Sequence, residues 1–159
     1  MTYTCLIKSP IGEIRASAKN GMLTGLWFVG QKYYPVQIDT WINDSNYRVF
    51  DLLRSWLSDY FVGGRPKQVI KLNPHGTDFQ KSVWNVLLKV PYGQLITYGE
   101  IAKQLSCLSA RAVGGAVGHN PISILIPCHR VIGSNGGITG YAGGIDKKNA
   151  LLKIERITV

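Results

Sequence analysis

The sequence is poor in cysteine and has no apolar run of membrane-spanning length. Its three cysteines, Cys5, Cys107 and Cys128, are odd in number and widely spaced, which argues against a disulfide framework. No CxxC pair or Cys/His cluster predicts a metal site, and the N-terminus lacks the apolar core of a signal peptide. These absences predict a reducing intracellular setting without a membrane, in which a reactive thiol can persist.

Acidic side chains are also scarce. Nine of them face 18 basic ones, which gives a formal net charge of +9. Such a balance favours a polyanionic partner, with nucleic acid first and an anionic membrane surface second, although a basic globular protein without such a partner has the same composition. With 45% hydrophobic and 17% charged residues, the chain is expected to fold around a substantial core.

The first half of the chain predicts an antiparallel meander. Residues 3–8, 14–18 and 23–29 read as strands, with turn signals at residues 9–12 and at the Asn20-Gly21 pair. After a stretch without clear periodicity, apolar residues recur at helical spacing over residues 50–61.

Asp44 or Ser45 is the expected cap of that helix, and residues 69–72 predict a further short strand. The Asn73-Pro74-His75-Gly76 turn then divides the chain into two predicted domains, residues 1–74 and 75–159.

The second half predicts short helices with strong N-terminal signals. Thr77 caps the first, and Thr97 with Glu100 forms a capping box for the second. Ser109 starts a third after a turn at residues 106–108, so the last two form a helix-turn-helix candidate. After a glycine-rich loop, Asp146 is the expected cap of a final helix.

The third helix of this half, residues 110–119, is rich in alanine and glycine. Small residues allow the backbone of this helix to lie very close to a neighbouring structure, which can simply be another helix of the same protein. With Arg111 at its N-terminal end, the helix also fits one that lies on DNA.

Residues 124–132 carry the most reactive chemistry. Apolar flanks predict burial, and Cys128, His129 and Arg130 lie between them. Positive neighbours stabilise the thiolate, which is the reactive form of cysteine. A small core hydrophobe is an equally good interpretation of Cys128 from these residues alone.

The combination of FQKSVW, LITYGEIA, ARAVGGAVGHNP, IPCHRVI and TGYAGG resembles the O6-alkylguanine-DNA alkyltransferases, also called methylated-DNA–protein-cysteine methyltransferases. The match covers residues 74–156. It implies an α+β fold: a small N-terminal antiparallel-sheet α/β domain of ribonuclease H-like type, then a helical, winged-helix-like C-terminal domain with a helix-turn-helix.

The resemblance also implies direct-reversal DNA repair. The alkyl group of O6-alkylguanine, and also of O4-alkylthymine, would pass irreversibly from duplex DNA to Cys128 in a single turnover without a cofactor. The expected protein is a monomer, cytoplasmic or, in a eukaryote, nuclear.

By the same resemblance, Cys128 is the alkyl acceptor and His129 the base that deprotonates it through a water. Glu155, on the last helix, would orient the imidazole, although such a residue is more often solvated. Tyr98 would donate to the leaving guanine at N3, and Asn120 would order the backbone beneath Cys128.

Arg111 would fill the gap in the base stack left by the flipped nucleotide, or otherwise contact a phosphate. The resemblance assigns further DNA contacts to Ala110, Ala112 and Gly115. The base pocket would be formed by Val131, Tyr141, Ala142 and Gly143. Family members often carry serine where Ala142 stands, and a backbone N–H contact survives that change. The zinc site of some members has no counterpart here, because Cys5 is the only cysteine in residues 1–76.

Two other functions compete with this one. A cysteine-dependent hydrolase or transferase of small substrates shares the Cys–His–Glu chemistry but gives no reason for the helix-turn-helix, Arg111 or the net charge. A non-enzymatic DNA-binding protein is the other: a helix-turn-helix regulator would not need the Pro-Cys-His-Arg segment, and an alkyltransferase-like protein lacks the acceptor cysteine, whereas Cys128 is present here.

Overall fold

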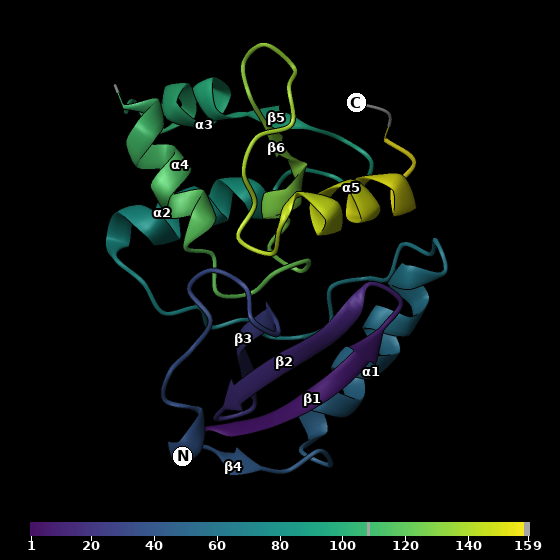
Figure 1. Ribbon diagram of the computed structural model, residues 1–159. Helices are drawn as coiled ribbons and strands as arrows, with labels where there is room; N and C mark the ends of the chain where they lie inside the picture. Colours follow the sequence, from purple (N-terminus) through teal and green to yellow (C-terminus); the bar gives the residue numbers. More distant parts are fainter. Residues whose placement is uncertain (108, 158–159) are drawn as a thin grey trace.

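The computed structural model describes residues 1–107 and 109–157. Figure 1 shows the strands β1 to β4 and helix α1 at one end of the molecule and helices α2 to α5 at the other. The protein is a mixed α+β fold, as the sequence predicts, while the ribonuclease H-like and winged-helix assignments stay predictions. No helix in the described part of the chain is long and apolar enough to cross a membrane.

The sheet has the strand order β3-β2-β1-β4. The meander of β1 (Tyr3–Ser9), β2 (Gly12–Lys19) and β3 (Met22–Phe28) is antiparallel, which confirms the three predicted strands. The short β4 (Ile42–Asn43) runs parallel to β1 at the edge. It follows a 3-10 turn, η1 (Ile38–Thr40).

Helix α1 (Arg48–Phe61) packs its apolar face against the sheet, with Phe50, Leu53 and Tyr60 buried. The predicted cap is wrong: the helix follows Tyr47 and has no side-chain cap. Asp44 instead accepts a hydrogen bond from the Asn46 amide, so its carboxylate is used in the turn before the helix.

The strand predicted at residues 69–72 is also wrong. This segment forms a single bridge, between Leu72 and Leu23 of β3. Val69 is exposed and Ile70 is buried, so the side chains alternate as in a strand, but only Leu72 pairs with β3 and the ladder does not extend to its neighbours.

Three predicted caps of the second half are confirmed. Thr77 begins α2 (Asp78–Leu88) with a complete capping box, and Thr97 with Glu100 does the same for α3 (Tyr98–Gln104). The Ser109 hydroxyl accepts from the Ala112 amide and begins α4 (Ala110–Gly118). The predicted turn between α3 and α4 includes Leu108, which lies outside the described residues.

The reactive stretch forms a 3-10 turn, η2 (Cys128–Arg130), followed by β6 (Val131–Ile132). Strand β6 pairs in parallel with β5 (Ile96–Thr97) beside α3. After the glycine-rich loop comes α5 (Ile145–Ile154). Its predicted cap is wrong: Gly144 precedes it with φ +100°, and Asp146 lies in the first turn without a capping hydrogen bond.

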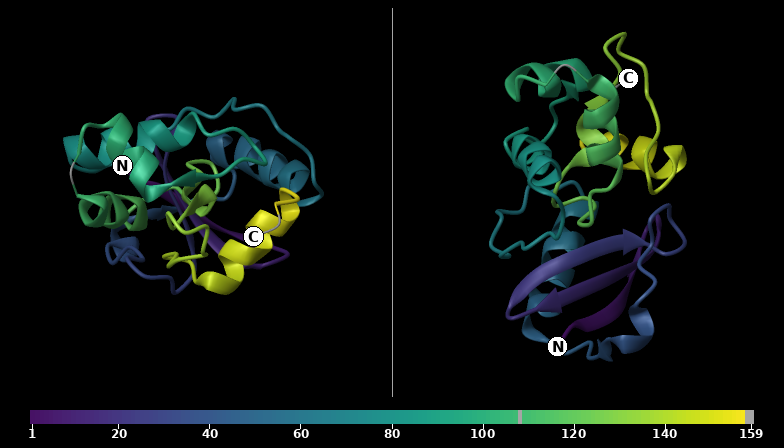
Figure 2. Two further views of the ribbon diagram at one scale, coloured as in Figure 1. Left: turned by 90° about the horizontal axis from the view of Figure 1, so that it is seen from above. Right: turned by 90° about the vertical axis from the view of Figure 1, so that its left-hand side faces the viewer.

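The two ends of the molecule share one continuous core. The Leu26 amide of β3 donates to the Pro121 carbonyl (2.8 Å), and the Ser123 amide donates to the Leu26 carbonyl (2.9 Å). The chain that leads to Cys128 is therefore bonded to the edge of the N-terminal sheet, and Figure 2 shows the two ends stacked at this junction. The division into residues 1–74 and 75–159 stays a prediction.

Candidate functional site

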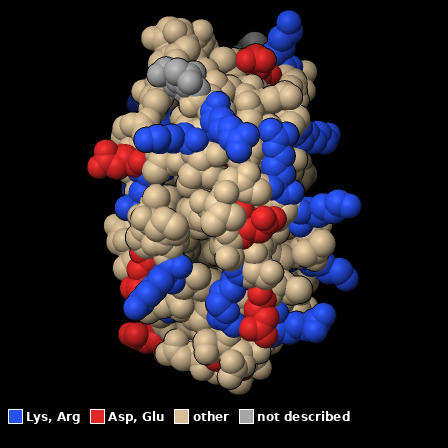
Figure 3. All heavy atoms as spheres, turned by 90° about the vertical axis from the view of Figure 1, so that its right-hand side faces the viewer, with Lys and Arg blue, Asp and Glu red and all other residues tan. Residues whose placement is uncertain are grey.

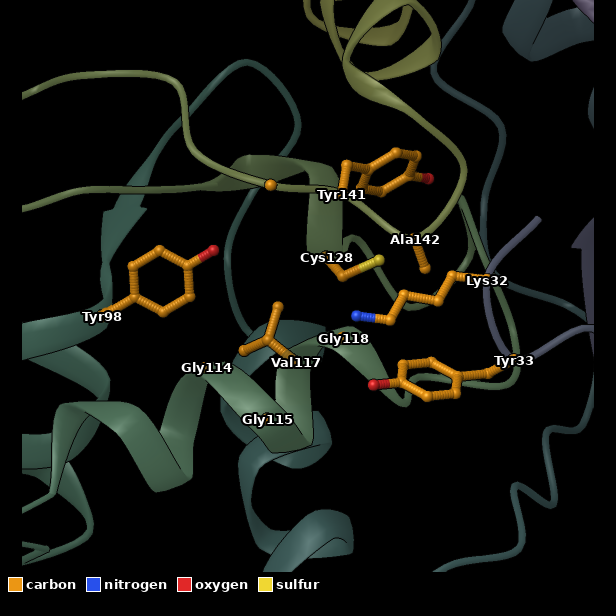
Figure 4. A pocket seen from close by; sticks show the side chains of 11 residues that line it. Lys32, Tyr33, Tyr98, Gly114, Gly115, Val117, Gly118, Cys128, Tyr141 and Ala142 are labelled. Atoms are coloured by element: carbon orange, nitrogen blue, oxygen red, sulfur yellow. The ribbon is translucent and has the colours of Figure 1, made fainter.

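A cavity of about 340 Å³ lies between α4, the glycine-rich loop and the loop that follows β3. Figure 4 shows Cys128 facing this cavity, Tyr98 on one side and Gly114 and Gly115 of α4 below. Tyr141 and Ala142 form the opposite lip. The structure thus brings together residues that the sequence predicts as acceptor, base pocket and DNA-binding helix.

Cys128 is buried at the floor of the cavity, on a tightly wound segment. The Asn120 side-chain amide donates to the carbonyls of Ile122 (3.2 Å) and Ile126 (2.8 Å), and its oxygen accepts from the Ile122 amide. Ile124, within this loop, has φ +71°, a conformation that β-branched residues rarely adopt. Asn120 therefore holds the strained loop that presents Cys128.

His129 is fully buried and is not among the residues that line the cavity. Its Nε2 lies 2.5 Å from Oε2 of Glu155, the residue at the C-terminal end of α5. Its Nδ1 is buried without a hydrogen-bond partner. His129 and Glu155 are thus in contact, as the resemblance implies, and Glu155 is buried rather than solvated.

Glu155 also binds residues to which sequence reasoning gave no such role. Arg130 donates through Nε (2.7 Å) and Nη2 (3.1 Å), and the Tyr60 hydroxyl donates at 2.6 Å. The Gly93 amide completes the set at 3.1 Å. Tyr60 was predicted only as part of an apolar helix face, and nothing in the sequence signals a partner 95 positions away.

The protonation states of this cluster follow from burial and from these hydrogen bonds. Burial alone would raise the pKa of Glu155, but hydrogen bonds from His129, Arg130 and Tyr60 hold it well below its usual range. Burial lowers the pKa of His129, an effect that the Glu155 carboxylate partly opposes. Near neutral pH the pair is therefore an ionised carboxylate and a neutral imidazole.

The thiol itself is protonated in the free protein. Burial raises the pKa of Cys128, although neighbouring Asn120 and Lys148 act in the opposite direction. A nucleophilic thiolate therefore requires a base, and the unpartnered Nδ1 of His129, on the adjacent residue, is a candidate.

Lys148 of α5 is a second buried group that sequence reasoning missed. Its ammonium donates to the carbonyls of Val131 (2.6 Å) and Thr139 (3.3 Å). Burial lowers the pKa of Lys148. The side chain fixes the glycine-rich loop against β6 and so sets the position of the pocket lip.

Tyr98 and Tyr141 present hydroxyls in different ways. Tyr98 OH accepts from Thr139 Oγ1 (3.0 Å), which leaves its own proton free to donate. Tyr141 OH is buried without a partner, and burial raises its pKa well above the usual range.

Gly143 is required at the lip, because a Cβ there would lie 2.8 Å from the Phe28 ring.

The small residues of α4 do not serve helix packing on the cavity side. A Cβ built on Gly115 or Gly118 would meet no described atom within 4 Å, while Val113 and Ala116 face the core. Trp84 of α2 donates to the Ala116 carbonyl (2.9 Å) and supports the helix from behind. The other predicted DNA contacts, Ala110, Arg111 and Ala112, are exposed on the same helix.

On the side of the molecule opposite α4, the basic side chains form no patch free of acidic ones. Figure 3 shows Lys and Arg side chains spread along the length of one side of the molecule, with acidic ones among them. In the described residues, no group of three or more His, Cys, Asp or Glu side chains is arranged to hold a metal.

The fold and the site thus define a mixed α+β protein. In its site, a thiol next to a buried histidine–glutamate pair faces a cavity, and the glycine-rich helix α4 lies beside this cavity. Residues 78–157 match the family described as 6-O-methylguanine DNA methyltransferase, DNA binding domain. The chain belongs to this family.

Relatives cover almost the whole chain. A methylated-DNA–protein-cysteine methyltransferase of Mycobacterium tuberculosis is 45% identical over 157 residues, which are 98% of this chain and 93% of the relative. One from Methanosarcina acetivorans is 46% identical over 96% of this chain and 97% of its own. The crystal structure of Mycobacterium tuberculosis OGT in complex with DNA matches with a TM-score of 0.91, 44% identity, and coverage of 97% and 93% of the two chains.

Proposed function

We propose that the protein repairs DNA by direct reversal, transferring the alkyl group of O6-alkylguanine in duplex DNA to its own Cys128. The observation that carries this proposal is the buried thiol at the floor of a cavity, with the His129–Glu155 pair behind it and the open face of α4 beside it. The names of the relatives and the DNA complex of the Mycobacterium tuberculosis protein support it.

Activation of the thiol follows from the tautomer of His129. The ionised Glu155 carboxylate can only accept, so His129 carries its proton on Nε2 and has a lone pair on Nδ1. That lone pair takes the Cys128 proton through a water. Glu155 stabilises the imidazolium that forms.

In the transfer step, Cys128 Sγ forms a bond to the alkyl carbon while the bond from that carbon to O6 breaks. The bonding electrons go to the guanine, which Tyr98 neutralises by donating its free proton toward N3. The product is a thioether on Cys128 and an unmodified guanine. No step regenerates the thiol, so each molecule acts once.

The DNA is bound by α4, through Arg111 and the small residues Ala110, Ala112 and Gly115. Arg111 fills the gap left when the damaged base leaves the stack, which offsets part of the unstacking cost of a few kcal/mol. The extruded base enters the cavity between α4 and the lip formed by Tyr141, Ala142 and Gly143. The Val131 carbonyl, held by Lys148, has a second lone pair for the guanine amino group.

The finer expectations belong to the same proposal. O4-alkylthymine is a second substrate, because its alkyl group, like that of O6-alkylguanine, is carried on an exocyclic oxygen that the same pocket can present to Cys128. The protein acts as a monomer in the cytoplasm, or in the nucleus of a eukaryote, where its three free cysteines stay reduced.

The test is intact-mass measurement after incubation with excess duplex containing O6-methylguanine. The expected result is the gain of one methyl per protein molecule, with no further turnover. Continuing turnover would indicate the small-substrate transferase instead, and DNA binding without any gain of mass would indicate a non-enzymatic DNA-binding protein.

A further inference from the structure

The N-terminal half of the chain contributes to the cavity that contains Cys128. After β3, the chain turns at Gly30 (φ +80°), and the Gln31 side chain accepts from the Phe28 amide at 2.9 Å. The Lys32 amide then donates to the Ala142 carbonyl at 3.1 Å. The segment of residues 29–34, here called the β3 loop, is thereby bonded to the lip of the pocket.

A second contact joins the β3 loop to the end of α4. The rings of Tyr33 and His119 are stacked, with centroids 3.9 Å apart and planes 23° from parallel. His119 follows the last residue of α4, at the opposite end from Arg111. Tyr33 has φ +63°, which a tyrosine rarely adopts and which this pair of contacts maintains.

These contacts place the Lys32 side chain at the mouth of the cavity. Figure 4 shows it extending between Ala142 and Tyr33 toward α4. Its ammonium lies 5.1 Å from the centroid of the Tyr33 ring. Among the described residues Lys32 forms no salt bridge, and the cavity is lined by no carboxylate.

We propose that Lys32 binds a backbone phosphate next to the nucleotide extruded into the cavity, so that the N-terminal half completes the DNA-binding surface. This rests on the proposed function and adds to it a contact outside the matched DNA-binding region, residues 78–157. The base occupies the cavity, and its flanking phosphates remain at the mouth, which α4 and the β3 loop enclose. A cation without an acidic partner at this point is complementary to those anions.

The nine residues of α4 span about 13 Å, so Arg111 and the β3 loop lie at the two ends of one short path along the DNA strand. Arg111 acts where the base leaves the stack, and Lys32 acts where the backbone bends toward the cavity. The pair of cations would thus hold the strand on both sides of the extruded base.

The test compares Lys32→Gln with Lys32→Arg, which keeps the charge, and with Lys19→Gln, which removes an exposed lysine at the end of β2. Binding to an O6-methylguanine duplex is measured against salt in a Cys128→Ala background, where no transfer occurs. We expect Lys32→Gln to weaken binding about fivefold to tenfold and to reduce the salt slope by about one, while Lys32→Arg and Lys19→Gln stay within about twofold of the parent.

The second measurement is the rate of alkyl transfer with Cys128 present. With duplex DNA, Lys32→Gln should be slowed about as much as binding is weakened, while free O6-benzylguanine, which has no phosphate, should react no more slowly than with the parent. An unchanged salt slope, or equal losses on both substrates, would overturn the role of Lys32. If the parent protein transfers no alkyl group while the salt slope still falls, the phosphate contact stands and the proposed reaction fails.

Discussion

The two sides of the Cys128–Arg130 turn differ sharply in how their polar groups are satisfied. Behind the turn, the Glu155 carboxylate accepts hydrogen bonds from Tyr60, Gly93, His129 and twice from Arg130. In front, the hydroxyl of the cavity-lining Tyr141 is buried without a partner, and so is Nδ1 of His129, the residue that follows Cys128. The Glu155 carboxylate is paired on both oxygens in the free protein, whereas the groups next to the thiol have an unused hydroxyl and an unused imidazole nitrogen.

The rear side of the turn holds the imidazole in place, and the front side carries the reacting groups. A buried carboxylate is costly unless it is fully paired, and Glu155 is paired on both oxygens, so it fixes the imidazole without freedom to reorient. Unpartnered buried polar atoms are also costly, and two of the three in the described residues belong to Tyr141, which lines the cavity, and to His129, which adjoins Cys128; the third is Trp56 Nε1 on α1. A water and an extruded base would supply the missing partners.

The largest expected effect comes from removing the thiol on the front side. Cys128→Ala should abolish alkyl transfer completely, because the acceptor is gone, and should leave binding to duplex DNA within about twofold, because α4 is untouched. Mass spectrometry and a binding titration check the two halves of this statement. A simultaneous loss of binding would show that the two roles are not separable in this way.

On the rear side, Glu155→Gln should lower the free energy of unfolding by about 3 kcal/mol, because it leaves the buried guanidinium of Arg130 without its counter-charge. It should also slow transfer, because the His129 tautomer is no longer fixed. Urea denaturation and single-turnover kinetics are the measurements. Asp146→Asn is the matched control, since it removes an exposed carboxylate from the first turn of α5 and should change stability by less than about 0.5 kcal/mol.

Local chemistry made much of the second half predictable, and long-range pairing did not. Thr77, Thr97 and Ser109 cap their helices through partners three residues away, so the sequence contains the whole interaction. The Tyr60–Glu155 contact joins residues 95 positions apart, and neither has a local signal for it. The same holds for Lys32, whose place at the cavity depends on how the N-terminal sheet packs against the segment before Cys128.

The two wrong cap predictions show that residue type near a helix start does not by itself locate the cap. Asp44 and Asp146 have the right residue type near a helix start, but the first is used in the preceding turn and the second lies inside the helix. A cap depends on the φ and ψ angles at one position, which residue type alone does not determine.

The pH dependence of stability tests the rear side without a change in sequence. The pKa values of Glu155 and His129 are both lowered in the folded protein, so on acidification the unfolded chain takes up protons that the folded chain resists. Their contribution to stability is fully present above about pH 6.5 and is lost as the pH falls below that value and then below about 4.3. Between about pH 4.3 and about pH 2.5, denaturation midpoints should fall more steeply for the parent than for Glu155→Gln, which has no carboxylate to protonate at this position, whereas parallel curves over this range would count against a buried, ionised Glu155.

A smaller effect is expected at the DNA side of the cavity. Arg111→Ala should slow repair of duplex DNA about tenfold, because the flipped base leaves an unfilled gap, and should leave the reaction with free O6-benzylguanine unchanged. Single-turnover rates on the two substrates provide the comparison. Equal losses on both would argue against a stack-filling role.

The smallest expected effect is that of one hydrogen bond behind the turn. Tyr60→Phe removes the hydroxyl that donates to Glu155 and keeps the ring, so it should cost about 1.5 kcal/mol of unfolding free energy. Transfer should be nearly unchanged, because Arg130 and His129 still hold the carboxylate. A transfer rate that falls as far as in Glu155→Gln would show that Tyr60 takes part in setting the imidazole.

The most direct measurement is peptide mapping of the protein after reaction with an O6-methylguanine duplex. Cys5, Cys107 and Cys128 are all free, so the position of the methyl group discriminates among three thiols. The structure predicts the methyl on Cys128 alone, at one per molecule, because only this thiol faces the cavity and adjoins the His129–Glu155 pair. A methyl on Cys5 or Cys107, or none on any cysteine, would contradict the account.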